Sequence, residues 1–382
     1  MLPRLRIHRS IRPILPLALL PSLLACNSAP PAPAPLSEAA RAAVAEDPGA
    51  PAGQVARALD NLFTDEAVGE TRAVVLMHEG EIAAERYAPG YGPDTRFVSW
   101  SMAKTVTAVM IGMLVADGRL ELDQPAPVPR WNRPGDPRAE ITLRHLLQMR
   151  SGLRHTESGE PPYRSSEVRM LFLDGRDDMA EFATAQPLEG EPGARFEYSS
   201  NTTVILADIA ARALTDSTDP EERRRAVADY LQTRIFAPLG MSSMVPEFDR
   251  AGTFIGGSLV HGTARDWARF GEFLRLKGSH RGAQLLPRGW VEAMIAPSPA
   301  SPHYGFQTWL NRDFERVEGE DHPLFPTRAP ATMFAMIGHM GQYTLISPEQ
   351  QVTLVRLGHS DAAQRSALLP RLAEVLELYP PR

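Results

Sequence analysis

The amino-acid sequence predicts an α+β fold (α/β in the broad sense) in which one antiparallel sheet is built from both ends of the chain. Early in the body, β-rich runs at residues 71–77 and 81–87 flank Glu79-Gly80, a pair typical of a hairpin turn. Helical patterns fill the middle of the chain, so we expect a mostly helical insert between two groups of strands. Three late runs have strand character, namely residues 334–337, 343–347 and 352–357.

Four segments carry helix signals. Residues 106–115 are apolar nearly all round, as expected of a helix buried on every side. A second helix is predicted over residues 143–149. Residues 267–276 follow Thr263 in a pattern that resembles an acidic capping box. Leucine and valine at helical spacing predict a last helix over residues 367–378.

Length and charge limit the possible organisation and partners. The 382 residues, 43% of them hydrophobic, are enough for one large domain or two modest ones. We expect an export signal over residues 1–25, a Pro/Ala-rich tether over 26–55 and a globular body over 56–382. The first 25 residues carry four arginines and no acid, so their removal takes the net charge from −6 to −10. An acidic body argues against nucleic acid and anionic membrane surfaces as partners.

The N-terminus has the pattern of a bacterial lipoprotein signal. A basic stretch up to Arg12 precedes an apolar run over residues 14–24, which is too short to span a bilayer. The run ends in Leu-Leu-Ala-Cys at Cys26, the only cysteine of the chain, so no internal disulfide can form. Lipidation of Cys26 predicts an exported protein anchored to a membrane of the cell envelope, with its body outside the cytoplasm. The alternative is an ordinary cleaved signal with an incidental cysteine.

A serine–lysine pair is the first candidate for chemistry. Of 40 basic residues 38 are arginine, and Lys104, one of the two lysines, lies three residues after Ser101. Arginine stays protonated at any working pH, whereas a buried lysine can lose its proton and act as a base. Positions i and i+3 share a helix face, and burial lowers the pKa of a lysine. Ser101 is therefore the candidate nucleophile and Lys104 its base, whereas Lys277 has the position of an ordinary helix-end cation.

Two further residues are weaker candidates when taken alone. Tyr198 lies at the junction before a predicted helix, where a phenol next to a cation can transfer protons. His339 lies in the pentapeptide 338–342 between two predicted strands, and glycines there often mark the close approach of a ligand. By itself, Tyr198 is more often a residue at the edge of the core and His339 more often a structural histidine.

Together these motifs resemble those of the penicillin-recognising serine hydrolases. The order is Ser-x-x-Lys, then Tyr-Ser about a hundred residues later, then His-x-Gly late in the chain. This superfamily includes class C β-lactamases, D-alanyl-D-alanine peptidases, class VIII esterases and 6-aminohexanoate-dimer hydrolases. Residues 141–153, 263–271 and 338–342 are also similar to stretches of the family, and the resemblance covers about residues 60–375. It implies a β-lactamase/transpeptidase-like fold, with helices flanking the central sheet.

The resemblance implies a role for each matching position. Ser101 would be the acylated nucleophile, Lys104 its base, and Tyr198 would share the proton transfer. The backbone N–H groups of Ser101 and Gln342 would form the oxyanion hole, worth about 3 kcal/mol per donor. No metal or organic cofactor is implied, and the sequence contains no His-Glu-x-x-His, P-loop or Gly-x-Gly-x-x-Gly motif.

The second and third motifs depart from the family pattern. His339 and Gly341 would line the strand along which the substrate lies, but β-lactamases and the peptidases usually carry Lys-Thr-Gly there. An unperturbed histidine is largely neutral at pH 7. The asparagine of the usual Tyr-x-Asn motif falls one position late, at Asn201, so it receives no role. Both departures weaken recognition of an anionic substrate, and the His-x-Gly-Gln form most resembles the esterase and oligoamide-hydrolase branch.

The sequence therefore predicts a serine hydrolase that cleaves an ester or amide bond of a small-molecule substrate through an acyl-enzyme. The enzymatic alternative is a β-lactamase or D-alanyl-D-alanine carboxypeptidase with a relaxed carboxylate site. A non-catalytic receptor for peptidoglycan fragments on the same fold is a third possibility, against which the intact Ser101, Lys104 and Tyr198 argue. A Ser-His-Asp α/β-hydrolase is disfavoured because the chain has no Gly-x-Ser-x-Gly elbow.

The acyl pocket is less predictable than the nucleophile. We expect loops around residues 157–179 and 314–330 to shape it, with Tyr163 and Trp309 as candidate lining residues. The oligomeric state is left open by the sequence.

Overall fold

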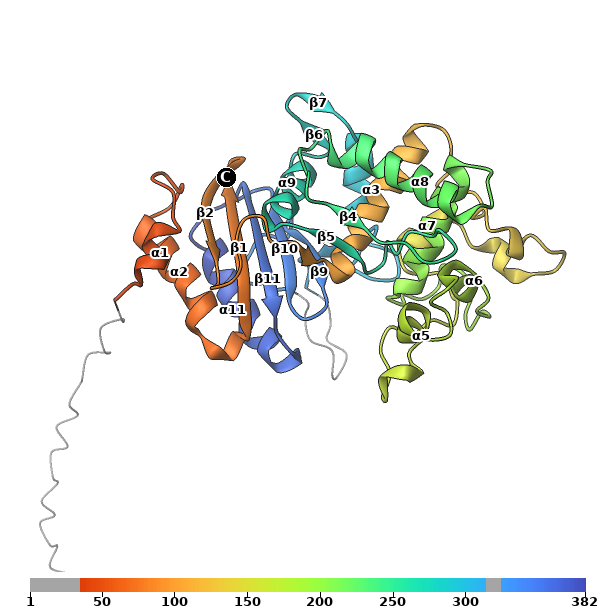
Figure 1. Cartoon of the computed structure of the whole chain (residues 1–382), viewed down its shortest axis with the longest axis horizontal. Helices are drawn as coiled ribbons and strands as arrows, with labels where there is room; N and C mark the ends of the chain where they lie inside the picture. Colours follow the sequence, from red (N-terminus) through yellow and green to blue (C-terminus); the bar gives the residue numbers. More distant parts are fainter. Residues whose placement is uncertain (1–34, 314–323) are drawn as a thin grey trace, which may run out of the picture. The chain divides into compact units, whose positions relative to one another are not determined.

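Strands from both ends of the chain form one six-stranded antiparallel sheet. In the computed structural model, which describes residues 35–313 and 324–382, the strand order is β2-β1-β11-β10-β9-β8 (Figure 1). Val75 of β1 lies opposite Glu85 of β2 on one side and Val355 of β11 on the other, so the last strand of the chain completes the first hairpin. The strands are β1 (Glu70–His78), β2 (Glu81–Tyr87), β8 (Trp309–Leu310), β9 (Phe334–Gly338), β10 (Gln342–Ser347) and β11 (Val352–His359).

Helices cover both faces of this sheet. Helices α2 (Ala52–Thr64) and α11 (Ala362–Leu376) pack on one face and α9 (Ala264–Arg275) on the other (Figure 1). Side chains of β1 alternate between the two: Val74 and Leu76 join the cluster with α2 and α11, whereas Ala73, Val75 and Met77 join the core shared with α9. This two-residue period is the expected pattern of a strand buried on both faces.

The helical insert lies between β2 and β8. Its central helix α3 is buried continuously from Ala103 to Leu114, as predicted from its all-round apolar sequence. The other helices of the insert are α4 (Leu143–Leu147), α5 (Ser166–Phe172), α6 (Met179–Thr184), α7 (Ser200–Leu214), α8 (Pro220–Leu231) and α10 (Arg288–Met294), with α3 itself spanning Ala103–Ala116. Two small sheets accompany them, made of β3 (Phe97–Val98), β4 (Val245–Pro246) and β5 (Val260–Gly262), and of β6 (Ser279–His280) and β7 (Ala283–Gln284).

Element boundaries differ from expectation where caps were not recognised. The final helix begins at Ala362, five residues before the predicted start, because Asp361 and Gln364 form a capping box. The predicted capping of α9 holds in part: Thr263 Oγ1 accepts a hydrogen bond from the Asp266 N–H at 3.3 Å. The Asp266 carboxylate instead accepts from the N–H of Ser243 at 2.8 Å, so the box is not reciprocal.

The compact unit begins at Leu36, earlier than the boundary expected at residue 56. Helix α1 (Glu38–Ala42) lies within the expected tether, and the backbone after it pairs with β2 through Ala45 N–H to Ala83 O, at 2.9 Å. The predicted export signal and Cys26 lie outside the described residues. Within residues 35–313 and 324–382, no helix is both long and apolar enough to cross a membrane.

Candidate active site

The candidate nucleophile lies on a constrained turn. Ser101 is in a short 3₁₀ helix, η2 (Trp100–Met102), which joins β3 to α3, rather than in the first turn of α3 itself. Ser99 ties this turn to β5, because its N–H donates to the Val260 carbonyl at 2.9 Å and its Oγ accepts from the Val260 N–H at 3.2 Å. Trp100 has φ +47°, a conformation that bulky residues rarely adopt. Such outliers concentrate at functional sites, where the surrounding structure holds them in place.

Lys104 lies directly behind Ser101 and is 1% exposed. Its Nζ donates to Ser101 Oγ at 2.8 Å, to Ser200 Oγ at 2.7 Å and to the Gly257 carbonyl at 2.8 Å. The same atom lies 4.7 Å from the centre of the Tyr198 ring. An ammonium has three N–H bonds, and here each has an acceptor. The predicted pairing of Ser101 with Lys104 is therefore present in the structure.

The surroundings raise the pKa of Lys104 above its ordinary value. Burial lowers this pKa, as the sequence predicted, but the interaction with Tyr198 and the charges of Glu157 and Glu167 act in the opposite direction and prevail. Glu157 Oε1 lies 3.7 Å from Nζ. The expectation of a neutral amine is thus wrong for the unliganded protein, because sequence reasoning weighed the burial of the lysine without the carboxylates that face it.

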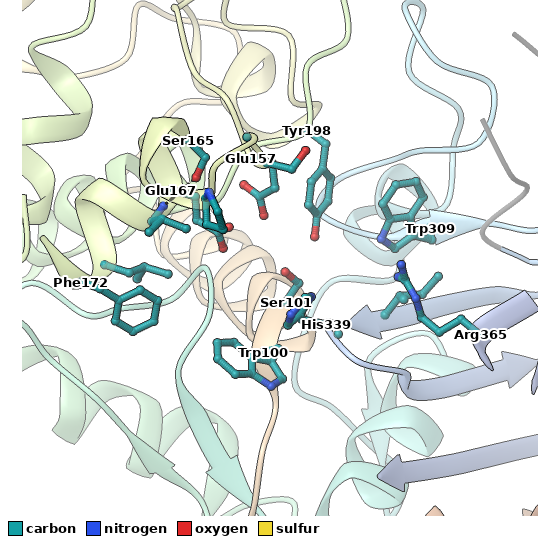
Figure 2. Close-up of a pocket in the computed structure, with 17 residues that line it drawn as sticks. Trp100, Ser101, Glu157, Ser165, Glu167, Phe172, Tyr198, Trp309, His339 and Arg365 are labelled. Carbon is teal, nitrogen blue, oxygen red and sulfur yellow. Dashed lines mark hydrogen bonds between the residues drawn. The ribbon is translucent and has the colours of Figure 1, made fainter. Parts of the chain in front are cut away.

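Tyr198 lies just before α7, whose N-cap Ser199 accepts from the Thr202 N–H at 3.4 Å. Figure 2 shows its phenol pointing toward Ser101. Burial raises the pKa of Tyr198, and the opposing effects of Lys104 and of hydrogen bonding with Ser101 do not cancel that rise. The phenol is therefore protonated in the unliganded protein and lies where it can exchange a proton with the serine–lysine pair.

Two carboxylates that sequence reasoning did not single out face the same lysine. Glu157 accepts from the Ser200 N–H at 2.6 Å and from Ser200 Oγ at 2.7 Å, and Glu167 Oε1 accepts from that Oγ at 3.1 Å. Burial and the charge of Glu157 raise the pKa of Glu167 to about 7. Both lie in the stretch expected to shape the pocket, but no motif marks them as partners of Lys104.

Asn201 has a structural contact instead of a place in the site. It is fully buried, and its side-chain amide contacts Ser166 of α5 at 3.3 and 3.4 Å. Ser200, one position earlier, is the residue of this segment that contacts Lys104. The absence of a predicted substrate-binding role for Asn201 agrees with this geometry.

The end of β9 forms the wall of the cavity that faces Glu157 and Glu167. Gly338 lets β9 approach the nucleophile turn, because a Cβ at this position would lie 2.3 Å from the Ser99 carbonyl oxygen. His339 is exposed, and its ring packs edge-on against Trp100 with 5.5 Å between ring centres. Desolvation of part of the imidazole and the charge of Arg365 lower the pKa of His339, so the ring is neutral at pH 7.

Gly341 and Gln342 do not line the cavity that contains Ser101. Gly341 has φ +81°, and its carbonyl accepts from Arg356 at 2.8 Å. The Gln342 side chain donates to the carbonyls of His339 and Met340 at 3.0 and 3.1 Å. In this structure both residues therefore fix the turn that presents His339.

The cavity above Ser101 measures about 470 Å³. Trp309, a predicted lining residue, is part of its wall, whereas Tyr163 is 60% exposed and is not. Arg365 of α11, which no sequence pattern indicated, reaches toward the cavity beside Trp309 (Figure 2). The lining residues are Trp100, Ser101, Glu157, Ser158, Gly159, Pro162, Ser165, Glu167, Val168, Leu171, Phe172, Tyr198, Trp309, Ile337, Gly338, His339 and Arg365.

The segment before α5 and α5 itself thus shape the cavity, which confirms the expectation for the 157–179 stretch over residues 157–172. The second expected loop, 314–330, lies partly outside the described residues. Among the residues that the structure describes, no group of three or more His, Cys, Asp or Glu side chains is placed to hold a metal ion.

Comparison with known proteins gives a consistent family assignment. Residues 63–377 match the family model described as beta-lactamase. The chain is 29% identical over 266 residues to a 6-aminohexanoate-dimer hydrolase of Paenarthrobacter ureafaciens, covering 65% of each protein. It is 32% identical over 183 residues to the esterase EstB of Burkholderia gladioli, covering 41% of this chain and 45% of that protein. The chain thus matches less than two thirds of the length of either relative.

A solved structure agrees in fold. A Bacillus anthracis protein provisionally assigned as a 6-aminohexanoate-dimer hydrolase superposes with a TM-score of 0.66 at 22% identity, covering 83% of this chain and 81% of that one. At that identity the likeness concerns the fold, and it confirms the predicted β-lactamase/transpeptidase-like architecture.

Proposed function

Because the chain belongs to the β-lactamase family, we propose that it is a serine hydrolase that cleaves an ester or amide bond of a small molecule through an acyl-enzyme on Ser101. The observation that carries this proposal is the 2.8 Å contact between Lys104 Nζ and Ser101 Oγ at the wall of a cavity about 470 Å³ in volume. A nucleophile held against a titratable base is the arrangement that covalent catalysis requires.

The proposed reaction has two halves. Ser101 Oγ attacks the acyl carbonyl as its proton passes to Lys104, and Tyr198 delivers a proton to the leaving group. Water then attacks the acyl-serine. Lys104 and Tyr198 now transfer protons in the reverse direction, from the water to the Ser101 oxygen. The wide cavity, with Trp100, Trp309 and Phe172 at its sides, would accommodate an apolar acyl or leaving group.

The developing oxyanion needs backbone donors. The Ser101 N–H is one candidate. The sequence suggested Gln342 for the second, but the segment of that hairpin that borders the cavity is 337–339. We therefore propose the Gly338–His339 backbone as the second donor, with Gly341 and Gln342 holding its turn in place.

Arg365 supports a second candidate function. A cation in the cavity restores part of the carboxylate recognition that the missing Lys-Thr-Gly lysine would provide. A β-lactamase or D-alanyl-D-alanine carboxypeptidase activity therefore stays a candidate beside the esterase or amidase activity. The likeness to a 6-aminohexanoate-dimer hydrolase favours the amidase activity between these candidates, since that name specifies an amide of an amino acid.

The test is hydrolysis of p-nitrophenyl butyrate by the full chain and by Ser101→Ala, with intact-protein mass spectrometry during turnover. We expect turnover by the parent chain only, and a mass increase of one butyryl group that is absent from the variant. Turnover by Ser101→Ala equal to that of the parent would refute the proposal. Binding of muropeptides without hydrolysis of any ester, amide or β-lactam would favour the receptor instead.

We also propose that Cys26 carries a lipid anchor, on the basis of its lipobox-like sequence. Cys26→Ala should move the protein from the membrane fraction to the soluble fraction after cell fractionation. Unchanged retention of the variant in the membrane fraction would contradict the anchor.

A further inference from the structure

Lys104 as it lies in the structure cannot accept the proton of Ser101. Its three N–H bonds point to Ser101 Oγ, Ser200 Oγ and the Gly257 carbonyl, and its pKa is raised. An ammonium with three occupied donors is not a base. If Lys104 is to act as one, a proton must first leave through one of those three contacts.

Ser200 is the contact through which a proton can leave. The Gly257 carbonyl has no proton to pass on, and transfer to Ser101 would work against its role as nucleophile. The Ser200 hydroxyl can receive a proton from Lys104 at 2.7 Å while giving its own to Glu157 at 2.7 Å or Glu167 at 3.1 Å. Direct transfer from Lys104 to Glu157 is less favourable, since those atoms are 3.7 Å apart.

The two carboxyl groups have different environments at this hydroxyl. Glu157 also accepts from the Ser200 backbone N–H at the start of α7, where a helix N-terminus favours negative charge. Glu167 has no such bond, and its pKa is raised to about 7 by burial and by Glu157. Two like charges that share one hydroxyl favour the binding of one proton between them. The pair can therefore hold one proton near neutral pH, on Glu167.

We propose that Ser200 and the Glu157–Glu167 pair form a proton relay that converts the Lys104 ammonium into the amine that deprotonates Ser101. The relay rests on the proposed roles of Ser101 and Lys104. Ser200, Glu157 and Glu167 act through Lys104 and are positioning residues.

The relay conserves atoms and charge. One Lys104 N–H bond breaks as an O–H bond forms on Ser200, and the original Ser200 O–H bond breaks as a carboxyl O–H bond forms on Glu167. An ammonium–carboxylate pair becomes an amine and a carboxylic acid. Lys104 then takes the proton of Ser101 and passes one, by way of Tyr198, to the leaving group. The relayed proton stays on Glu167, so Lys104 is again an amine for the second half of the reaction.

Substrate binding drives the transfer. Glu157 and Glu167 line the cavity, so a bound acyl group excludes water from them. Loss of water disfavours the charged forms of both lysine and carboxylate, and thus favours the neutral pair. Among residues 35–313 and 324–382, the charged or titratable groups that face this cluster are Lys104 from α3, Tyr198 from the segment before α7, and His339 and Arg365 across the cavity from β9 and α11.

The first test is the pH dependence of p-nitrophenyl butyrate hydrolysis by the full chain. The relay needs a free carboxylate, so kcat/KM should fall as the pH drops through about 7. In Glu167→Gln only Glu157 is left to accept the proton from Ser200, and no like charge lies beside it, so this acidic limb should move down by about one pH unit or more. In Ser200→Ala kcat should fall about 100-fold at every pH, because the link to the carboxylates is lost.

Glu197→Gln is the matched control. Glu197 also has a raised pKa and directly precedes Tyr198, but its partner is Arg195 at 3.2 Å. Its substitution should leave the profile unchanged. A Glu167→Gln enzyme whose activity falls while its acidic limb stays in place would overturn the relay, since a purely structural role gives that result. Retention of most activity by Ser200→Ala would overturn it too.

A second test observes Lys104 directly. The chain has two lysines, so Lys277→Arg leaves Lys104 as the only one, and ¹³Cε-lysine labelling then gives one resonance to follow by NMR. Glu167→Gln should lower the titration midpoint of that resonance, and an unchanged midpoint would contradict the coupling. This readout is independent of turnover. Loss of activity in Ser101→Ala with no Glu167 effect in either test would leave the serine mechanism in place and remove the relay alone.

Discussion

The two walls of the cavity differ in how firmly their charged groups are held. On the helical wall, Lys104 is 1% exposed and each of its N–H bonds has a partner from a different segment. On the sheet wall, His339 is exposed, and the guanidinium of Arg365 has no hydrogen-bond or ion-pair partner among residues 35–313 and 324–382. Within the described part of the chain Arg365 is therefore unpaired, whereas the charge of Lys104 is already engaged.

This difference separates chemistry from recognition. Covalent catalysis needs atoms fixed within a few tenths of an ångström, which buried, saturated hydrogen bonds provide. Recognition of varied substrates needs charges that become paired only when a ligand arrives. We therefore expect substitution of the lysine on the helical wall to lower turnover of every substrate, and substitution of the charged or titratable side chains on the sheet wall to change which substrates are turned over.

The largest effect is expected at Lys104. Lys104→Arg keeps a positive charge but cannot lose a proton at working pH, and Lys104→Met keeps the length without the charge. Both should lower kcat/KM by about 1000-fold or more. Lys277→Arg is the control, because Lys277 is paired with Glu292 at 3.1 Å and lies outside the cavity. If Lys104→Arg kept a tenth of the activity while folding normally by circular dichroism, a charge alone would suffice and the base role would be wrong.

Substitution of Gly338 tests whether catalysis needs the close approach of β9 to the nucleophile turn. In Gly338→Ala the new Cβ would meet the Ser99 carbonyl at 2.3 Å, so β9 and the nucleophile turn must separate. A shift of this order should lower kcat about 100-fold. Gly289→Ala is the matched change, since a Cβ there meets nothing within 4 Å. Equal activity of the two variants would show that the approach of β9 is not needed for catalysis.

The same contrast explains what the sequence could predict. Ser101 and Lys104 share a local i, i+3 spacing, the role of Tyr198 was predicted through the family resemblance, and the strands and the buried helix follow from the hydrophobic period. Their placement at one site agrees with those predictions. The continuous burial of α3 follows from its composition, because its residues are apolar on nearly every side.

Glu157, Glu167 and Arg365 were not predicted because nothing local marks them. Each is an ordinary charged residue in a loop or helix, and its function depends on which distant segment it meets in the folded chain. The predicted direction of the Lys104 pKa shift was wrong for the same reason. Burial can be predicted from composition, whereas the sign of the surrounding charge requires the tertiary structure.

On the sheet wall, Arg365 should set the preference for anionic substrates. Arg365→Ala should lower kcat/KM for the mono-p-nitrophenyl ester of glutarate about tenfold and leave that for p-nitrophenyl butyrate nearly unchanged. The effect should shrink at high salt, because the cation is partly accessible to solvent. Arg371→Ala, on the same helix but paired with Glu374 and Asp65, is the control. An equal loss with both esters would indicate a structural role for Arg365 and remove it from recognition.

The smallest effect is expected at His339. Burial and the charge of Arg365 lower its pKa, so the ring is neutral at pH 7. His339→Gln should therefore change kcat/KM by no more than about fivefold, the value of one neutral hydrogen bond or ring contact. It should also leave the acidic limb near pH 7 in place, because Glu167 and not His339 titrates there. Disappearance of that limb in His339→Gln would instead assign the titration to the histidine, and would make its side chain part of the chemistry.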